Sequence, residues 1–198
     1  MASRTGERKL QILQILAEML QEPKAERITT AALAAKLQVS EAALYRHFAS
    51  KAQMFEGLIE FIEQTIFGLI NKIQGDEKSP TEQLHAILSM LLGFAEKNPG
   101  MTRVLVGDAL VNEDGRLQVR INQLHDRLET TIKQCLRVIA PGASTSTDGA
   151  TTRPPNDDPT AHANVLLCFV IGRWHQFAKS GFKRRPSEHW ERQWPILL

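Results

Sequence analysis

The sequence has few of the features that indicate secretion, a membrane location or a β-rich fold. Its 198 residues include two cysteines, and Phe, Trp and Tyr together make up only 6% of the chain. No apolar run approaches the roughly 18 residues of a transmembrane helix, and the charged N-terminus lacks the apolar stretch of a secretory signal. Cys135 and Cys168 form no Cys-x-x-Cys pair, so they are free thiols of a reducing compartment or one disulfide. We expect a cytoplasmic protein without membrane association.

Signals of enzymatic chemistry are missing as well. The sequence has no Gly-x-Ser-x-Gly elbow, no P-loop and no Gly-x-Gly-x-x-Gly dinucleotide fingerprint. Its six histidines are spaced too widely for a metal site, since the closest two are His162 and His175. The sequence therefore predicts a protein that is not an enzyme and uses neither a metal nor a cofactor. An α-helical enzyme is kept as the most distant alternative.

Apolar residues recur with a helical period along most of the chain, and no alternation typical of strands is present. The expected helices cover 10–20, 30–37, 41–48, 51–75, 80–97, 101–111, 115–139 and 161–179. The segment from about 140 to 160 is rich in Pro, Thr, Ser and Asp, so we expect a flexible loop there. We expect the tryptophans of the C-terminal tail, Trp190 and Trp194, to pack in the core or against a dimer partner. The predicted fold class is all-α.

Positive charge is concentrated near the N-terminus, although the whole chain has a net charge of only +2. Residues 1–55 hold eight Lys or Arg against five Asp or Glu, whereas the remaining residues are nearly neutral. A basic head on a neutral body is typical of a polyanion-binding module attached to a second unit.

Two short helices joined by a tight turn around Gln38 form a candidate helix-turn-helix after the first longer helix. Gln38 stands where glycine is common, and a left-handed backbone there would cost about 1 kcal/mol. Ser40 is a natural cap of the second helix, and Thr29 and Thr30 are candidate caps of the first.

The second of these helices would present its N-terminal end to a major groove. Its short side chains there, on Ser40, Ala42 and Ala43, would allow close approach to base edges. Polar and cationic groups suited to phosphate contacts follow or flank them: Thr29, Thr30, Tyr45, Arg46, His47 and Lys51. On spacing alone, an ordinary αα-hairpin in a helical bundle explains the pattern equally well.

The runs Thr29-Thr30-Ala31-Ala32-Leu33-Ala34 and Val39-Ser40-Glu41-Ala42-Ala43-Leu44-Tyr45-Arg46-His47-Phe48-Ala49-Ser50-Lys51 resemble the DNA-binding signature of the TetR family. The resemblance implies a three-helix DNA-binding head over residues 1–52. It also implies a helical body over residues 53–198 that forms a homodimer.

Segments of the body are similar to one branch of that family. They are Leu-Ile-Glu-Phe-Ile-Glu at 58–63, Leu-Leu-Gly-Phe-Ala-Glu-Lys-Asn-Pro-Gly at 91–100, Arg-Leu-Gln-Val-Arg-Ile-Asn-Gln-Leu at 116–124, Phe-Lys-Arg-Arg-Pro at 182–186 and Trp-Pro at 194–195. This resemblance implies nucleoid occlusion: a nucleoid-associated homodimer binds palindromic sites on double-stranded DNA and antagonises the division protein FtsZ. It also implies that Phe61, Gly93, Lys97 and Asn98 contact FtsZ.

Two alternatives stay open at this stage. A ligand-responsive TetR-type repressor would have the same head, together with a body enclosing an apolar pocket of more than about 300 Å³. Phe61 lies about 120° from the centre of the apolar stripe of its helix. It is therefore either an exposed anchor for a partner or a contact between the head and the body.

Overall fold

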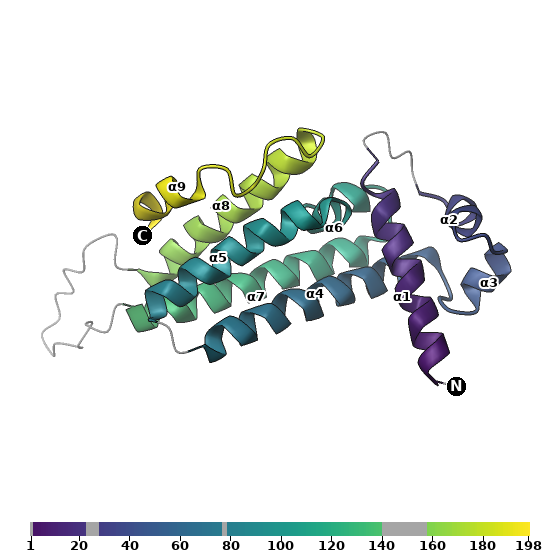
Figure 1. The fold of residues 1–198 in the computed structure, drawn as a ribbon, viewed down its shortest axis with the longest axis horizontal. Coiled ribbons are helices and arrows are strands. Elements are labelled where there is room, and N and C mark those ends of the chain that lie inside the picture. Colours follow the sequence, from purple (N-terminus) through teal and green to yellow (C-terminus); the bar gives the residue numbers. More distant parts are fainter. Residues whose placement is uncertain (1, 23–27, 77–78, 140–157) are drawn as a thin grey trace, which may run out of the picture.

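The computed structural model describes residues 2–22, 28–76, 79–139 and 158–198, and within these ranges the protein is all-α (Figure 1). The N-terminal helices form a head at one end of an elongated body. The head consists of α1 (Ala2–Met19), α2 (Thr30–Lys36) and α3 (Glu41–Tyr45). The body consists of α4 (Lys51–Gly75), α5 (Pro80–Lys97), α6 (Pro99–Leu105), the 3-10 helix η1 (Asp108–Leu110), α7 (Gly115–Ile139), α8 (Pro159–Lys179) and α9 (Trp190–Leu197).

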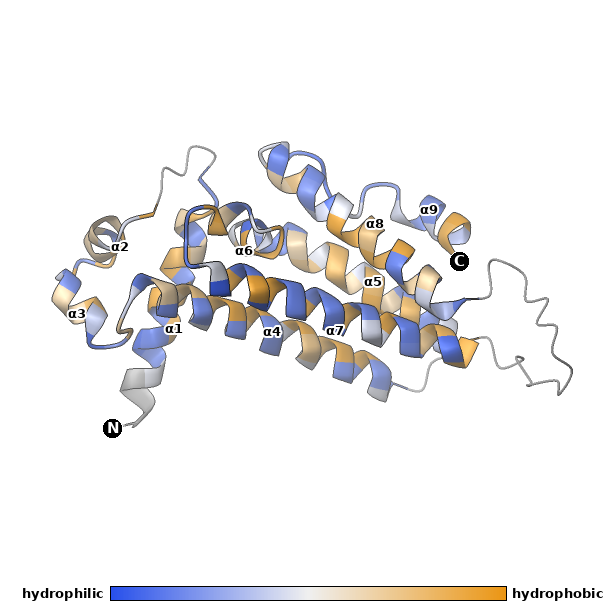
Figure 2. Cartoon of the chain, turned by 180° about the vertical axis from the view of Figure 1, so that it is seen from behind, coloured by the Kyte–Doolittle hydropathy of each residue, from blue (hydrophilic) through white to orange (hydrophobic). Residues whose placement is uncertain are grey.

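The long helices α4, α5, α7 and α8 run lengthwise through the body, and α7 packs against the other three. Each carries an apolar stripe beside a hydrophilic one (Figure 2), as expected for helices that share one core. Side chains at the centre of this core are 0% exposed, including Ile62, Leu88, Leu124 and Trp174. The indole nitrogen of Trp174 donates to the carbonyl of Leu91 at 3.0 Å, so its one polar group is satisfied.

The head is held against the end of the body by α1, which packs on α4 and α6 (Figure 1). Gly100 on α6 permits a very close approach, because a Cβ there would lie 1.9 Å from the carbonyl oxygen of Ala17. Arg103 on the same helix donates to the carbonyl of Leu20 at 3.3 Å. The buried residues form one continuous cluster from Ile12 in the head to Trp190 near the C-terminus, so head and body share one apolar core.

The long helices of the body occupy the predicted ranges, whereas α1 begins at Ala2 instead of residue 10, and three shorter elements also differ from the sequence prediction. The helix predicted for 41–48 ends at Tyr45. The helix expected over 101–111 instead covers Pro99–Leu105, because proline is favourable in the first turn, and left-handed Gly107 (φ 77°) separates it from η1. The tail was not predicted to be helical, yet it forms α9. The predicted loop at 140–160 lies outside the described residues, except for its last three positions, where α8 begins.

The cysteines and the candidate metal ligands can be placed within the described ranges. Both cysteines are free; Cys135 is buried, whereas Cys168 is exposed. No three His, Cys, Asp or Glu side chains of the described residues gather as metal ligands would. None of the helices placed in these ranges is both long enough and apolar enough to cross a membrane.

His125 on α7 predicts a specific dependence of stability on pH. Burial lowers the pKa of its ring, and a hydrogen bond with the backbone of Leu105 offsets this only in part. Its Nε2 atom is buried without a partner among the described residues. As pH falls below about 6.5, His125 becomes protonated in the unfolded chain but stays neutral in the folded chain. The free energy of unfolding therefore decreases.

His125→Gln removes this proton uptake, and its free energy of unfolding should therefore fall less steeply between pH 7.5 and 5.5 than that of the wild type. One proton contributes at most about 1.4 kcal/mol per pH unit to the difference. Urea denaturation at several pH values measures both slopes. Equal slopes would mean that His125 titrates alike in the folded and unfolded chains.

Candidate nucleic-acid interface and partner surface

The turn between α2 and α3 contains one residue with a left-handed backbone. Gln38 has φ 56°, and its amide donates to the carbonyl of Ala35 at 3.0 Å. The amide of Val39 donates to the carbonyl of Ala34, also at 3.0 Å, which closes the end of α2. Leu33 and Leu44 are 1% exposed beneath the turn and fix the crossing of the two helices.

Side-chain caps and one bond between helices set the start of α3. Ser40 Oγ accepts from the amide of Ala43 at 3.2 Å, and Thr29 Oγ1 caps α2 by accepting from Ala32 at 3.1 Å. The expectation that Thr30 also caps α2 was wrong. Thr30 is the first residue within α2, and its hydroxyl donates to Glu41 at 2.6 Å, which links α2 directly to α3.

The predicted nucleic-acid contacts divide into two groups in the structure. One group lies on the α2–α3 unit, and its members Thr29, Ser40, Ala42, Tyr45 and Arg46 are exposed, Tyr45 by 45%. Thr30 and Ala43 are half-buried beside them. The Tyr45 hydroxyl donates a long hydrogen bond of 3.5 Å to Thr30, so it is free to rotate toward another acceptor. This first group forms one continuous polar edge at the far end of the head.

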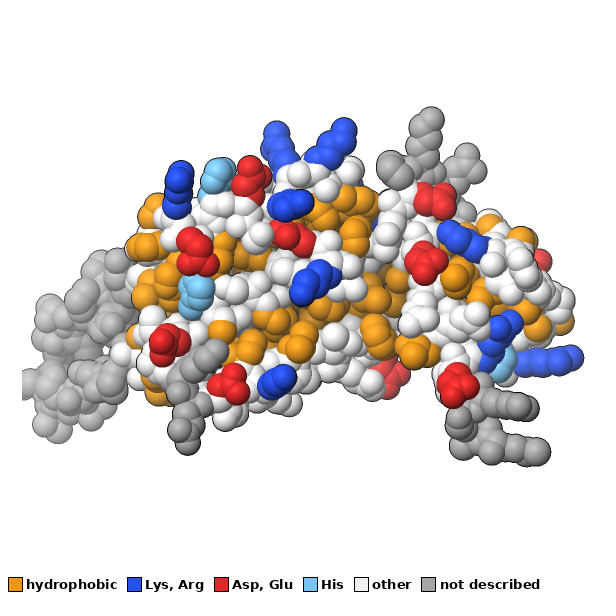
Figure 3. All heavy atoms as spheres, viewed as in Figure 1, with side chains coloured by type: hydrophobic (Ala, Val, Ile, Leu, Met, Phe, Trp, Pro, Cys, Tyr) orange, Lys and Arg blue, Asp and Glu red, His pale blue; other side chains and the backbone are white. Residues whose placement is uncertain are grey.

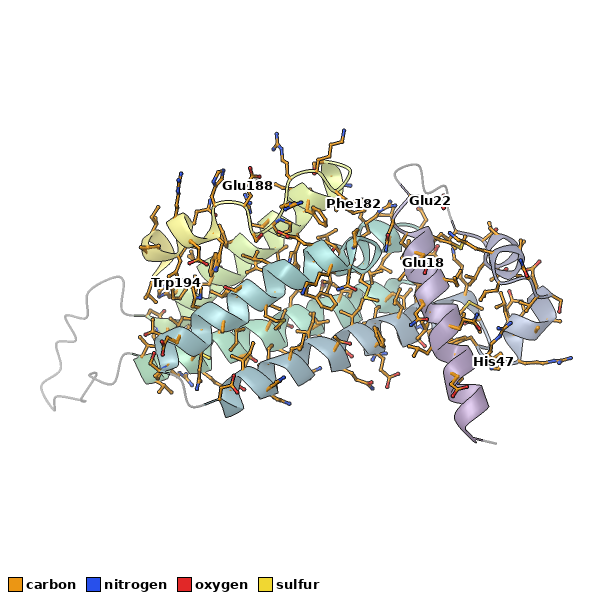
Figure 4. All side chains as sticks on the ribbon, viewed as in Figure 1. Glu18, Glu22, His47, Phe182, Glu188 and Trp194 are labelled. Atoms are coloured by element: carbon orange, nitrogen blue, oxygen red, sulfur yellow. The ribbon has the colours of Figure 1, made fainter. Side chains whose placement is uncertain are left out.

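The second group, His47 and Lys51, is turned inward. His47 is half-buried, and its Nδ1 atom is enclosed without a partner in the described chain; Figure 4 labels it between α1 and α3. Lys51 pairs with Glu113 from the body, and its ammonium lies 5.7 Å from the centre of the Phe55 ring. Lys51 therefore connects the head to the body. It could contact a phosphate only if its ion pair with Glu113 were broken.

The predicted partner residues lie on α4 and α5, which are adjacent in the body. Glu56 and Glu63 on α4 pair with arginines of α7, and Phe61 lies on the opposite side of the helix from them. Phe61 is half-buried and packs against the core rather than standing free. Figure 3 shows apolar side chains among polar ones along the junction of α4 and α5.

The α5 residues give that junction an open edge. A Cβ added at Gly93 would meet nothing within 4 Å, and Lys97 one turn later is exposed. The Asn98 side chain is already used, because its amide donates to the carbonyl of Phe94 at 2.8 Å and ends α5. Asn98 therefore shapes the end of the surface and has only part of its polar capacity left for a partner.

Several residues that fix these surfaces were not identified from the sequence. Arg103 and Glu113 join head to body, and Arg120 on α7 donates to Glu63 at 2.9 Å. Their partners are more than 50 residues away in the sequence, so no local spacing indicates the pairs.

Comparison with known proteins places both parts of the chain. Residues 12–58 match the model of bacterial regulatory proteins of the tetR family, and residues 78–198 match a tetracyclin repressor-like C-terminal domain of the SlmA-like type. Among solved structures, the TetR family regulator PfmR of Thermus thermophilus superposes with a TM-score of 0.71 at 20% identity, covering 94% of this chain and 96% of that one. FadR of Bacillus subtilis, solved with stearoyl-CoA, also gives 0.71, at 12% identity and with 95% and 96% covered. These two establish the fold.

Curated relatives are much more similar in sequence. Nucleoid occlusion factor SlmA of Alteromonas mediterranea is 52% identical over 94% of this chain and 92% of its own length. Its namesake from Idiomarina loihiensis is 49% identical, with 100% and 96% covered. The chain therefore belongs to the TetR family of DNA-binding regulators. Within that family, it is a member of the group of SlmA nucleoid occlusion factors.

Proposed function

We propose that this protein acts as a homodimer that binds palindromic DNA through residues 1–52 and inhibits FtsZ assembly through residues 53–198, while it is located on the nucleoid. The observation that carries the proposal is the separation of two surfaces on one chain. A polar, partly cationic edge lies on α2–α3, and an open apolar junction lies between α4 and α5. Sequence identity of about 50% to nucleoid occlusion factors, over nearly the full length, supports assigning DNA to the first surface and FtsZ to the second.

In the DNA complex, α3 enters the major groove with its N-terminal end. Ala42 and Ala43 are small enough to let the helix approach thymine methyl groups closely. Thr29, Tyr45 and Arg46 contact phosphates, and these contacts position the helix without specifying a sequence. Two heads separated by roughly 34–36 Å read successive major grooves of a palindrome.

The outer sides of α7 and α8 supply the dimer contact as a four-helix bundle with the partner's pair. Apolar side chains exposed on this part of the single chain include Val119 (55%), Val138 (60%) and Val165 (53%). A second copy that covers them removes apolar surface from water.

The junction of α4 and α5 suits a short peptide that is acidic and partly apolar, as the FtsZ tail is in this family. Phe61 supplies an aromatic contact, Gly93 leaves space for the peptide backbone, and Lys97 attracts its carboxylates. The junction of α4 and α5 lies on the body, so it stays accessible when the head is bound to DNA.

A ligand-responsive repressor is the competing function, and the body gives it less support. Two hollows lined by described residues lie at the margins of the body: one of about 400 Å³ is lined by Thr81, His85 and Trp194, and one of about 300 Å³ by Arg103, Asp108 and Phe182. The centre of the body is filled instead by side chains that are 0% exposed, such as Leu88 and Trp174.

Genome-wide mapping of bound DNA tests the proposed function in the cell. We expect many sites scattered over the chromosome and few near the replication terminus, because inhibition acts where the sites lie and the septum must still be able to form. A single bound site beside a neighbouring gene would instead indicate a local repressor.

A further inference from the structure

The link between α8 and α9 carries three adjacent cations, Lys183, Arg184 and Arg185, which we call the cationic loop. All three side chains are exposed, and none forms an ion pair with an acidic group of the described chain. The nearby acidic groups have other partners: Asp108 pairs with Lys179 and Arg103, and Glu188 lies 3.7 Å from His189. In Figure 3, Lys and Arg side chains project from this edge of the molecule. The protein therefore presents a local excess of positive charge on an otherwise balanced body.

Side chains of α8 and α5 form hydrogen bonds with this link. Arg173 on α8 donates to the carbonyls of Arg185, Pro186 and Glu188 at 2.8, 2.9 and 2.8 Å. Glu96 on α5 accepts from both the amide and the hydroxyl of Ser187, at 2.7 and 2.6 Å. Five hydrogen bonds to side chains of α8 and α5 thus hold residues 185–188 in place.

The segment before the cations is equally fixed. Ser180 Oγ accepts from the amides of Lys183 and Arg184 at 3.1 and 2.9 Å. Phe182 has a left-handed backbone with φ 64°, and its ring packs on Phe177 at 5.2 Å between centroids. A bulky residue keeps such a conformation only where its surroundings enforce it. The three cations are therefore displayed on a rigid support, which lowers the entropy lost when they bind a ligand.

We propose that the cationic loop binds the phosphate backbone of a second DNA duplex, separate from the duplex held by the head, so that one protein bridges two DNA segments. This inference goes beyond the proposed function. Three neighbouring cations on a fixed backbone complement successive phosphates, and they need no base contacts to do so. In Figure 1, α1 stands between this loop and α3, so the duplex in contact with α3 is not the one that the loop faces.

A membrane surface is the other polyanion that could attract the loop, but the structure favours DNA. Stable attachment to a bilayer needs apolar insertion besides three positive charges. The apolar residues near the cations are already in use, because Pro186 is buried and Phe182 packs on Phe177. Figure 4 labels Phe182 near Glu22, and the two residues line the same hollow.

A capture assay tests the proposal. The protein is first loaded on a fluorescent operator duplex, and loading is measured separately by anisotropy; failure at that step counts against the proposed function of the head. The loaded complex is then passed over an immobilised duplex that lacks the operator. Lys183→Gln/Arg184→Gln/Arg185→Gln should reduce captured fluorescence at least fivefold at low salt, while operator affinity stays within threefold. The salt slope of capture should also decrease by up to about 2.7, at 0.9 per lost phosphate contact.

The control is Lys72→Gln/Arg192→Gln, which removes exposed cations elsewhere on the body and outside the α7 and α8 dimer contact. It should capture the second duplex as the wild type does. Equal capture by the loop variant and the wild type, or equal loss in the loop variant and the control, would overturn the proposal. So would a loop variant that captures DNA normally but no longer co-sediments with vesicles containing 30% phosphatidylserine, which would assign the loop to a membrane.

Discussion

Replacing Tyr45 by alanine is expected to weaken operator binding about tenfold for each head that engages, while the melting temperature changes little. The side chain is 45% exposed and has one long hydrogen bond within the protein, so its removal leaves no cavity. A lost phosphate contact costs on the order of 1.4 kcal/mol per head. Because the contact is to the backbone, the loss should be similar for specific and non-specific duplexes.

Arg46→Gln should act in the same way and should also reduce the salt slope by about 0.9 per head, since the guanidinium displaces one counterion. Lys72→Gln removes an equally exposed charge at the far end of α4 and serves as the matched control. Fluorescence anisotropy at two salt concentrations measures affinity and slope together. Unchanged affinity in both head variants would exclude α3 from the groove.

Thr29 needs a different substitution, because it has two roles. Its hydroxyl caps α2, so Thr29→Ala should destabilise the head by about 1 kcal/mol whether or not it contacts DNA. Thr29→Asp keeps a capping oxygen but has no hydroxyl proton to donate to a phosphate, so it separates the two roles.

The second large effect is expected at the junction of α4 and α5. Phe61→Ala should abolish inhibition of FtsZ assembly, whereas operator affinity should stay within threefold, or under about 0.7 kcal/mol. Phe61 packs against the core but lies away from α2 and α3, so its loss removes the aromatic contact without moving the DNA-binding edge. Sedimentation of FtsZ polymers and anisotropy with labelled operator give the two readings.

Two further variants make that result interpretable. Phe67→Ala removes an aromatic ring from the same helix on the side where Arg127 lies 3.9 Å from the ring centroid, so FtsZ inhibition should persist. Gly93→Leu fills open space at the junction of α4 and α5, and its Cβ meets no backbone atom there. This variant should keep the fold but prevent the binding of FtsZ. If Phe61→Ala also destroys DNA binding, that ring serves to hold the head on the body.

Local sequence signals predicted most of the fold because they act within a few residues. The helix α5 begins at Pro80 as the sequence predicted, and Ser79 and Glu82 form a complete capping box there. The start of α6 was misplaced because Pro99 was interpreted as a breaker, although proline is compatible with a first turn. The helix α9 depends on tertiary contacts, since Trp190 donates to Ser89 at 2.6 Å and stacks on His85.

The candidate surfaces, like the fold, could be predicted from the sequence only where neighbouring residues determine them. Residues of the α2–α3 edge follow one another in the sequence, so their grouping could be predicted from spacing and resemblance. The inward position of Lys51 could not, because it depends on Glu113, which lies 62 residues further along the chain. Likewise, the helical wheel places Phe61 off the core stripe, but only the packed structure shows that it is half-buried.

One protein bound to its operator should also stop FtsZ assembly. Sedimentation of FtsZ polymers in GTP, with the protein already saturated by operator duplex, measures this most directly. We expect the pellet to shrink as the loaded complex is added and to recover when the Phe61→Ala variant replaces the wild type. A pellet of full size with the operator occupied would mean that DNA and FtsZ compete for the protein instead of binding it together, and would exclude the proposed function.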